Sequence, residues 1–103
     1  MWIVSLKALR DFWISGHAKA QAPLTEWYKV TKSATWNNIV EVRKVFPSAD
    51  TVTVASGKSI VVFNIGGNNY RLIAAIHYNL QKVFVLRVLT HAEYDKDNWK
   101  AQL

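Results

Sequence analysis

The sequence predicts an α+β fold in which helices pack on one face of a twisted, mainly antiparallel sheet. Apolar residues recur at helical spacing as far as Phe46, and after Pro47 the pattern changes to short runs rich in β-branched residues. The connections between these runs are only a few residues long, which favours antiparallel neighbours. With 103 residues, half of them hydrophobic, we expect one domain spanning residues 1–103.

The first part of the chain predicts one strand followed by two helices. Residues 2–4 are β-prone, and Ser5 is a suitable N-cap for a helix that stops before Gly16. Pro23 suits the first turn of a second helix. The side chains expected to face the core from these two helices are Leu6, Leu9, Phe12, Trp13, Leu24, Trp27, Tyr28 and Thr31.

A short third helix and the rest of the sheet should follow. Asn38, with Glu41 three residues later, resembles a capping box, and Pro47 ends the helix. Thr90 and Glu93 repeat the capping pattern, so a short helix or turn should begin at His91. Strands are expected over residues 51–55, 59–65, 70–78 and 82–89, with a glycine turn at 66–69. The helices should leave the other sheet face free to work.

The amino-acid composition favours some classes of function and excludes others. Thirteen Lys and Arg against seven Asp and Glu give a net charge of +6, which is typical of proteins that bind nucleic acid, although the same surplus can serve solubility alone. The absence of cysteine excludes disulfides, thiolate–zinc sites and cysteine nucleophiles. The longest apolar stretches have four or five residues, and no signal peptide is recognisable. We therefore expect a cytoplasmic protein with no membrane segment.

Arg71 is the first candidate for chemistry. It stands one residue into a strand, on the same face as Ile73, Ala75 and His77. An arginine among apolar neighbours needs an acidic partner or an anion, and its forked guanidinium matches a phosphate. A salt bridge and an exposed edge position are the open alternatives. Arg87 on the next strand should emerge on the opposite face if the hairpin is symmetric, although a β-bulge would reverse this.

A second group of ionisable side chains follows the last strand: His91, Tyr94, Asp95 and Lys96. Histidine is the usual proton shuttle near neutral pH, and tyrosine and lysine can act as acid or base. A helix starting here would also direct free backbone N–H groups at an anion. The alternative for His91 is an exposed residue without a catalytic role, and His77 is more typical of a partly buried, satisfied histidine. The three histidines show no metal-ligand spacing, so neither a metal nor a cofactor is expected.

These motifs together resemble one protein family. The block 62–68, then Tyr70-Arg71-Leu72, then Thr90-His91-x-Glu93-Tyr94-Asp95-Lys96, is similar to the HigB toxins of bacterial type II toxin–antitoxin modules, within the RelE-like superfamily. The resemblance covers nearly the whole chain. It implies a RelE-like fold and a metal-independent mRNA interferase, an endoribonuclease that cleaves mRNA on the translating ribosome. It also implies neutralisation by a HigA-type helix-turn-helix antitoxin.

The resemblance also implies roles for individual residues. Arg71 would contact the scissile phosphate, and His91, Tyr94 and Lys96 would complete the catalytic site. Asn68, Arg87 and Lys58 are the further candidates for contacts with RNA. The alternative function is a non-catalytic module that binds RNA or the ribosome and inhibits translation.

Overall fold

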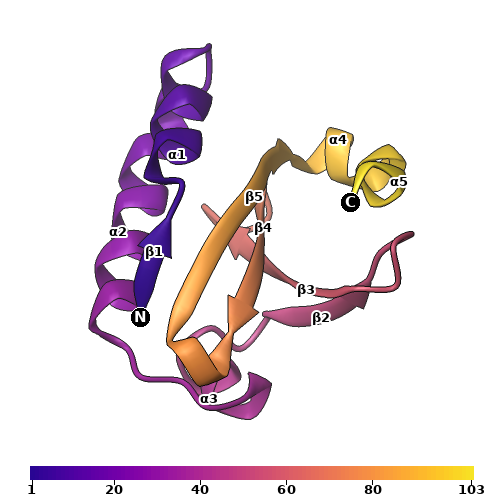
Figure 1. The fold of residues 1–103 in the computed structure, drawn as a ribbon. Helices are drawn as coiled ribbons and strands as arrows, with labels where there is room; N and C mark the ends of the chain where they lie inside the picture. Colours follow the sequence, from indigo (N-terminus) through magenta and orange to yellow (C-terminus); the bar gives the residue numbers. More distant parts are fainter.

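The computed structural model describes residues 1–103, and its elements form one five-stranded sheet with helices on both faces (Figure 1). In chain order they are β1 (Trp2–Val4), α1 (Leu6–Ile14), η1 (Ala18–Ala20), α2 (Gln21–Ser33), α3 (Ile39–Val45), β2 (Asp50–Thr53), β3 (Ser59–Ile65), β4 (Tyr70–His77), η2 (Tyr78–Leu80), β5 (Lys82–Thr90), α4 (His91–Asp95) and α5 (Asn98–Gln102). The strand order is β1-β5-β4-β3-β2. Only β1 runs parallel to its neighbour, so the predicted α+β class and mainly antiparallel sheet are confirmed.

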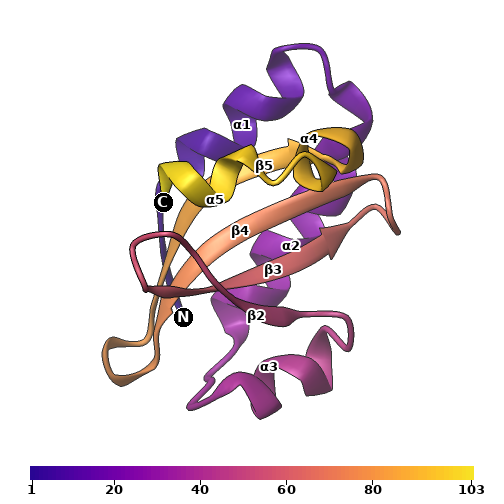
Figure 2. The ribbon, with the colours of Figure 1, turned by 90° about the vertical axis from the view of Figure 1, so that its right-hand side faces the viewer.

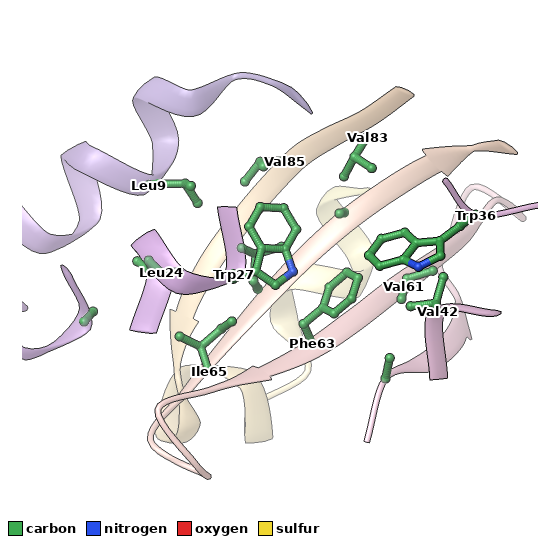
Figure 3. Close-up of a cluster of buried hydrophobic side chains, with 14 residues drawn as sticks. Leu9, Leu24, Trp27, Trp36, Val42, Val61, Phe63, Ile65, Val83 and Val85 are labelled. Carbon is green, nitrogen blue, oxygen red and sulfur yellow. The ribbon is translucent and has the colours of Figure 1, made fainter. Parts of the chain in front are cut away.

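The main core lies between the sheet and helices α1, α2 and α3 (Figure 3). Trp27 of α2 is buried against Phe63 of β3, with the ring centroids 5.5 Å apart in an edge-to-face arrangement. Phe46 packs edge-to-face against both Phe63 and Trp36. Large aromatic side chains dominate such a core because each buries much apolar surface. The expectation that Trp27 serves packing is therefore confirmed.

The opposite sheet face is only partly free. Figure 2 shows α4 and α5 in front of the sheet, crossing its upper half. Trp99 of α5 is buried in a second, smaller cluster with Val54, Ile60, Val62 and Ile73. The expectation that this whole face is uncovered is wrong. The five residues of α5 are too short for a periodic apolar pattern, so Trp99 is the only sign of α5 in the sequence.

The helix starts follow the sequence with one exception. The Asn38 side chain accepts a hydrogen bond from Glu41 N at 3.1 Å, and Thr90 with Glu93 forms a complete capping box. Helix α1 begins at Leu6 as predicted. Ser5, however, has a φ of 72°, and its side chain caps nothing, so the predicted capping role is wrong.

None of the helices in the structure combines the length and the apolar character that crossing a bilayer requires.

Candidate active site

The turn between β3 and β4 joins the two groups of candidate residues. Gly66 and Gly67 both have positive φ, at 62° and 68°, which the turn requires and which glycine adopts without strain. The carbonyl oxygen of Asn68 accepts a hydrogen bond from Arg71 Nη1 at 3.1 Å. The carbonyl oxygen of the next residue, Asn69, accepts one from His91 N at 3.0 Å. The same turn therefore anchors Arg71 and the first residue of α4.

Arg71 is buried, with 8% of its surface exposed, yet no acidic side chain lies within 4 Å of it. Its Nη1 donates to the carbonyl oxygens of Asn68 and Tyr70, at 3.1 and 3.0 Å. Its Nε and Nη2 have no protein partner, and neither is fully sealed from solvent. The salt bridge and the exposed edge position that the sequence left open are therefore both absent. Arg71 is therefore a buried cation whose Nε and Nη2 donors remain available for a ligand.

Tyr94 of α4 lies over this guanidinium. The Arg71 Cζ atom is 5.4 Å from the centroid of the Tyr94 ring, a cation–π distance. The Tyr94 ring also stacks on Trp99, with centroids 5.3 Å apart and an interplanar angle of 20°. Trp99 Nε1 donates to the Tyr94 carbonyl oxygen at 3.0 Å. The three side chains form a stack across β4, α4 and α5, which fixes the Tyr94 ring beside Arg71.

His91 has an acidic partner in Asp95, a pairing that was not predicted from the sequence. His91 Nδ1 lies 2.7 Å from Asp95 Oδ2, four residues further along α4. When Nδ1–H of a neutral imidazole donates a hydrogen bond to this carboxylate, the lone pair of Nε2 is free to act as a base. Histidine and aspartate at i and i+4 after a capping box are the signal that could have identified the pair.

The N-terminus of α4 offers little to an anion. His91 N is bonded to Asn69, and Glu93 N to the Thr90 hydroxyl at 3.2 Å. The Glu93 carboxylate also accepts from Thr90 N at 3.0 Å, placing a negative charge at this end of the helix. The expectation that α4 directs free N–H groups at an anion is therefore wrong for these two groups.

A β-bulge places Arg87 on the same sheet face as Arg71. Ile73 pairs with Arg87, but Ala74 pairs with Val85, which leaves Leu86 as the extra residue of β5. Directly paired residues point to the same side of a sheet. The expectation that Arg87 emerges on the opposite face is therefore wrong, and the bulge alternative is the one observed.

Arg87 and Lys96 line a hollow of about 240 Å³, which we call the Arg87–Lys96 hollow. No acidic side chain forms a salt bridge with either of them. Glu93 also lines the hollow, but its carboxylate is occupied at the start of α4. The remaining lining residues are Leu89, Asn98, Trp99 and Gln102. Two cationic side chains and one carboxylate therefore line this hollow.

The other candidates lie further apart. Asn68 is exposed in the turn beside Arg71. Lys58 lies in the connection between β2 and β3 and lines a different hollow, together with His77 from the far end of β4. His77 is exposed, so the expectation of a partly buried histidine is wrong. No three His, Asp or Glu side chains form a group that could hold a metal ion.

The comparisons with known proteins agree with this architecture. The model of the HigB_toxin family, described as the RelE-like toxic component of a toxin–antitoxin system, matches residues 20–97. The chain is 36% identical over 69 residues to the mRNA interferase HigB of Escherichia coli O6:H1, a stretch covering 67% of this chain but only 65% of that relative, just under two thirds. It is 28% identical over 95 residues to the mRNA interferase toxin HigB of Escherichia coli K12, covering 92% and 88% of the two chains. The family model spans well over half of the sequence, and the chain therefore belongs to the HigB toxin family.

Proposed function

We propose that this chain is the toxin of a toxin–antitoxin module and acts as an mRNA interferase, an endoribonuclease. Curated relatives that match it carry the name mRNA interferase HigB. The single observation that carries the proposal is the state of Arg71, a buried arginine without an acidic partner, which lies beside Tyr94 on the face opposite the main core. A guanidinium that the protein leaves unneutralised is suited to a phosphodiester.

The reaction needs little from the protein beyond orientation, proton transfer and charge stabilisation. The 2′-hydroxyl oxygen of the substrate forms a bond to phosphorus while the bond to the 5′-oxygen breaks, leaving a cyclic phosphate and a free 5′-hydroxyl. The Nε and Nη2 groups of Arg71 stabilise the charge that develops on the phosphoryl oxygens. His91, oriented by Asp95, takes the proton from the 2′-hydroxyl. Tyr94 and Lys96 are the candidate donors of a proton to the leaving 5′-oxygen.

Three further side chains complete the proposed RNA surface. Arg87, which lines the same hollow as Lys96, would hold a neighbouring phosphate. Asn68, in the turn next to Arg71, can hydrogen-bond to the same strand. Lys58 extends the positive charge toward the other end of the sheet face.

The partners follow from the family. Its description as the toxic component of a toxin–antitoxin system supports an antitoxin that covers the working face. We propose that this antitoxin is a HigA-type helix-turn-helix protein. We also propose that cleavage is metal-independent and occurs on mRNA bound to the ribosome, and that the toxin and its antitoxin act in the cytoplasm.

Arg71 provides the direct test. The experiment is inducible expression with mapping of mRNA 5′ ends, comparing wild type with Arg71→Ala and Arg71→Lys. Loss of one charge-stabilising donor should lower cleavage by about 10²–10³-fold in Arg71→Ala. Arg71→Lys keeps the charge but loses the fork, so its activity should be intermediate. Arg10→Ala, an exposed arginine on α1 without a salt bridge, is the matched control and should cleave like wild type. Wild-type cleavage by a folded Arg71→Ala variant would remove the assignment.

Substitutions of the proton-transfer residues His91 and Tyr94 distinguish an enzyme from a module that only binds RNA. His91→Gln and Tyr94→Phe leave the positive charge of the surface unchanged. An enzyme should keep RNA binding but lose about 10²–10⁴-fold of its cleavage rate in these variants. Translation inhibition that persists at full strength in both variants would favour a module that only binds.

A further inference from the structure

The sheet face carries a second hollow that the proposed chemistry does not use. It measures about 610 Å³ and is lined mainly by apolar side chains from β3, β4 and β5, with Lys58 at its edge. In Figure 2 the β4–β5 end of the sheet, at lower left, has no helix in front of it. Phe84 and His77 lie at this end, so we call the space the Phe84 hollow.

Aromatic side chains are concentrated here. Phe84 is half-buried, and the exposed ring of His77 meets it edge-to-face, with centroids 5.2 Å apart. Trp2 pairs with Lys82, which in turn pairs with His77, so all three side chains point to the same sheet face. Trp2 is 70% exposed and packs into neither core cluster. Exposed aromatic rings on an open sheet are the usual platform on which single-stranded bases stack.

The charged side chains around the Phe84 hollow are all basic, and the last residue of the chain, Leu103, also lines it. Lys58 lines it and Lys82 lies in the adjoining row, and neither forms a salt bridge. No Asp or Glu side chain lines the hollow. A purely apolar protein segment would gain nothing from these lysines, whereas a nucleotide presents an apolar ring and an anionic phosphate together.

The bulge in β5 connects this hollow to the candidate active site. A bulge sets two successive residues opposite one, and here Leu86 lines the Phe84 hollow while Arg87 lines the Arg87–Lys96 hollow. Ala75, also in the Phe84 hollow, is four residues from Arg71 on the same face, or about 13 Å along the strand. A short stretch of one RNA strand can therefore reach both places.

We propose that the Phe84 hollow is a subsite for a nucleobase of the single-stranded RNA that flanks the cleaved phosphodiester. The base stacks on the ring of Phe84, and Lys58 contacts the adjacent phosphate. This subsite rests on the proposed function, because it extends the same strand beyond Arg71 and Arg87. It adds affinity and fixes the register of the strand, and it takes no part in bond breaking.

The test measures binding separately from cleavage. The probe is a fluorescent single-stranded oligoribonucleotide with 2′-fluoro sugars, which lacks the nucleophile and stays intact, and affinity is read by anisotropy. Phe84→Leu keeps an apolar side chain but removes the ring, and should weaken binding by roughly 5- to 150-fold, the range for losing one base–aromatic stack. A single abasic nucleotide, moved along the probe, should weaken wild type at one position and leave Phe84→Leu unaffected there.

Two matched controls accompany these variants. Lys58→Gln should weaken binding several-fold with a shallower salt dependence, whereas Lys29→Gln, an exposed lysine on α2, removes the same charge and should not. Trp13→Leu changes an aromatic residue in the hollow between α1 and α2, and should bind like wild type. Lys58 is exposed, so its substitution tests the subsite even if Phe84→Leu fails to fold.

The outcomes separate the subsite from the enzyme. If cleavage in cells depends on Arg71 but wild type shows no abasic-sensitive position and Lys58→Gln binds like Lys29→Gln, the subsite is wrong and the proposed function stands. If Phe84→Leu loses antitoxin binding but keeps full RNA affinity, the hollow docks a protein and the proposal is overturned. If wild type binds with the expected abasic position yet does not cleave RNA in cells, the subsite stands and the proposed function fails.

Discussion

Arg71 carries a charge that the folded chain shields but does not neutralise. Burying a cation is costly unless hydrogen bonds compensate, and here two backbone carbonyls and the Tyr94 ring provide part of that compensation. The three acids of the C-terminal segment are occupied elsewhere: Glu93 caps α4, Asp95 holds His91, and Asp97 pairs with Lys100. The local arrangement thus keeps carboxylates away from the one buried guanidinium, which leaves it available to an external anion.

Tyr78 gives a prediction for the pH dependence of stability. Burial raises the pKa of Tyr78, and the nearby Arg43 opposes this only partly. Above the ordinary tyrosine pKa of about 10, the unfolded chain releases a proton that the folded chain still holds, so stability falls as the pH rises. Tyr78→Phe removes this contribution, and its free energy of unfolding should decline less than that of wild type between pH 8 and 11. Urea unfolding at each pH measures it, and parallel curves for the two proteins would contradict the assignment.

Residue types in the candidate site could be predicted from the sequence, but most of their pairings could not. Arg71 stood out because an arginine follows a glycine turn at the start of an apolar strand. That it lies under Tyr94 depends on the direction α4 takes after β5, which no local pattern encodes. The pairing of His91 with Asp95 is the exception, because residues four apart on one helix are neighbours.

At the scale of elements, strand boundaries were the most predictable feature. The glycines and asparagines at 66–69 mark a turn by their own backbone preferences, and β3 spans the residues that the sequence indicates. The bulge at Leu86 was not predictable, because it reflects how β5 fits against β4 and not any residue that requires it. This one-residue shift decided whether Arg87 joins Arg71 or faces the main core.

The packing of helix α5 against the sheet should depend on a single side chain, that of Trp99. Trp99 is 4% exposed, packs in the second core cluster and stacks on the Tyr94 ring. Trp99→Ala should lower the free energy of unfolding by about 3–5 kcal/mol, as expected for truncating a buried tryptophan. It should also reduce cleavage, because Tyr94 loses its stacking partner.

The matched control for Trp99 is Trp2→Ala, which removes the same side chain from a position that is 70% exposed. Its effect on unfolding should stay within about 0.5 kcal/mol. Both values come from urea denaturation followed by tryptophan fluorescence and circular dichroism. Equal losses in the two variants would show that α5 is not held by Trp99.

Over the whole molecule, positive charge is more abundant than its partners. Of the thirteen Lys and Arg side chains, only Lys7, Arg43 and Lys100 lie within 4 Å of a carboxylate of Asp. Arg71, Arg87, Lys96 and Lys58 all belong to the sheet face opposite the main core or to segments that border it. The net charge attracts an anionic polymer in general, and these four residues concentrate unpaired positive charge on the sheet face opposite the main core.

The salt dependence of RNA binding separates general attraction from contacts on this face. Each phosphate neutralised on a single strand releases counterions, so the logarithm of affinity falls against the logarithm of salt with a slope of about −0.7 per contact. Arg87→Gln should make this slope shallower by about 0.7. Lys29→Gln also removes one positive charge, but from helix α2, and should leave the slope unchanged. Anisotropy titrations of the uncleavable probe over a range of salt concentrations measure both slopes. Equal changes in the two variants would mean that RNA is attracted by overall charge, and the assignment of Arg87 to a phosphate contact would have to be abandoned.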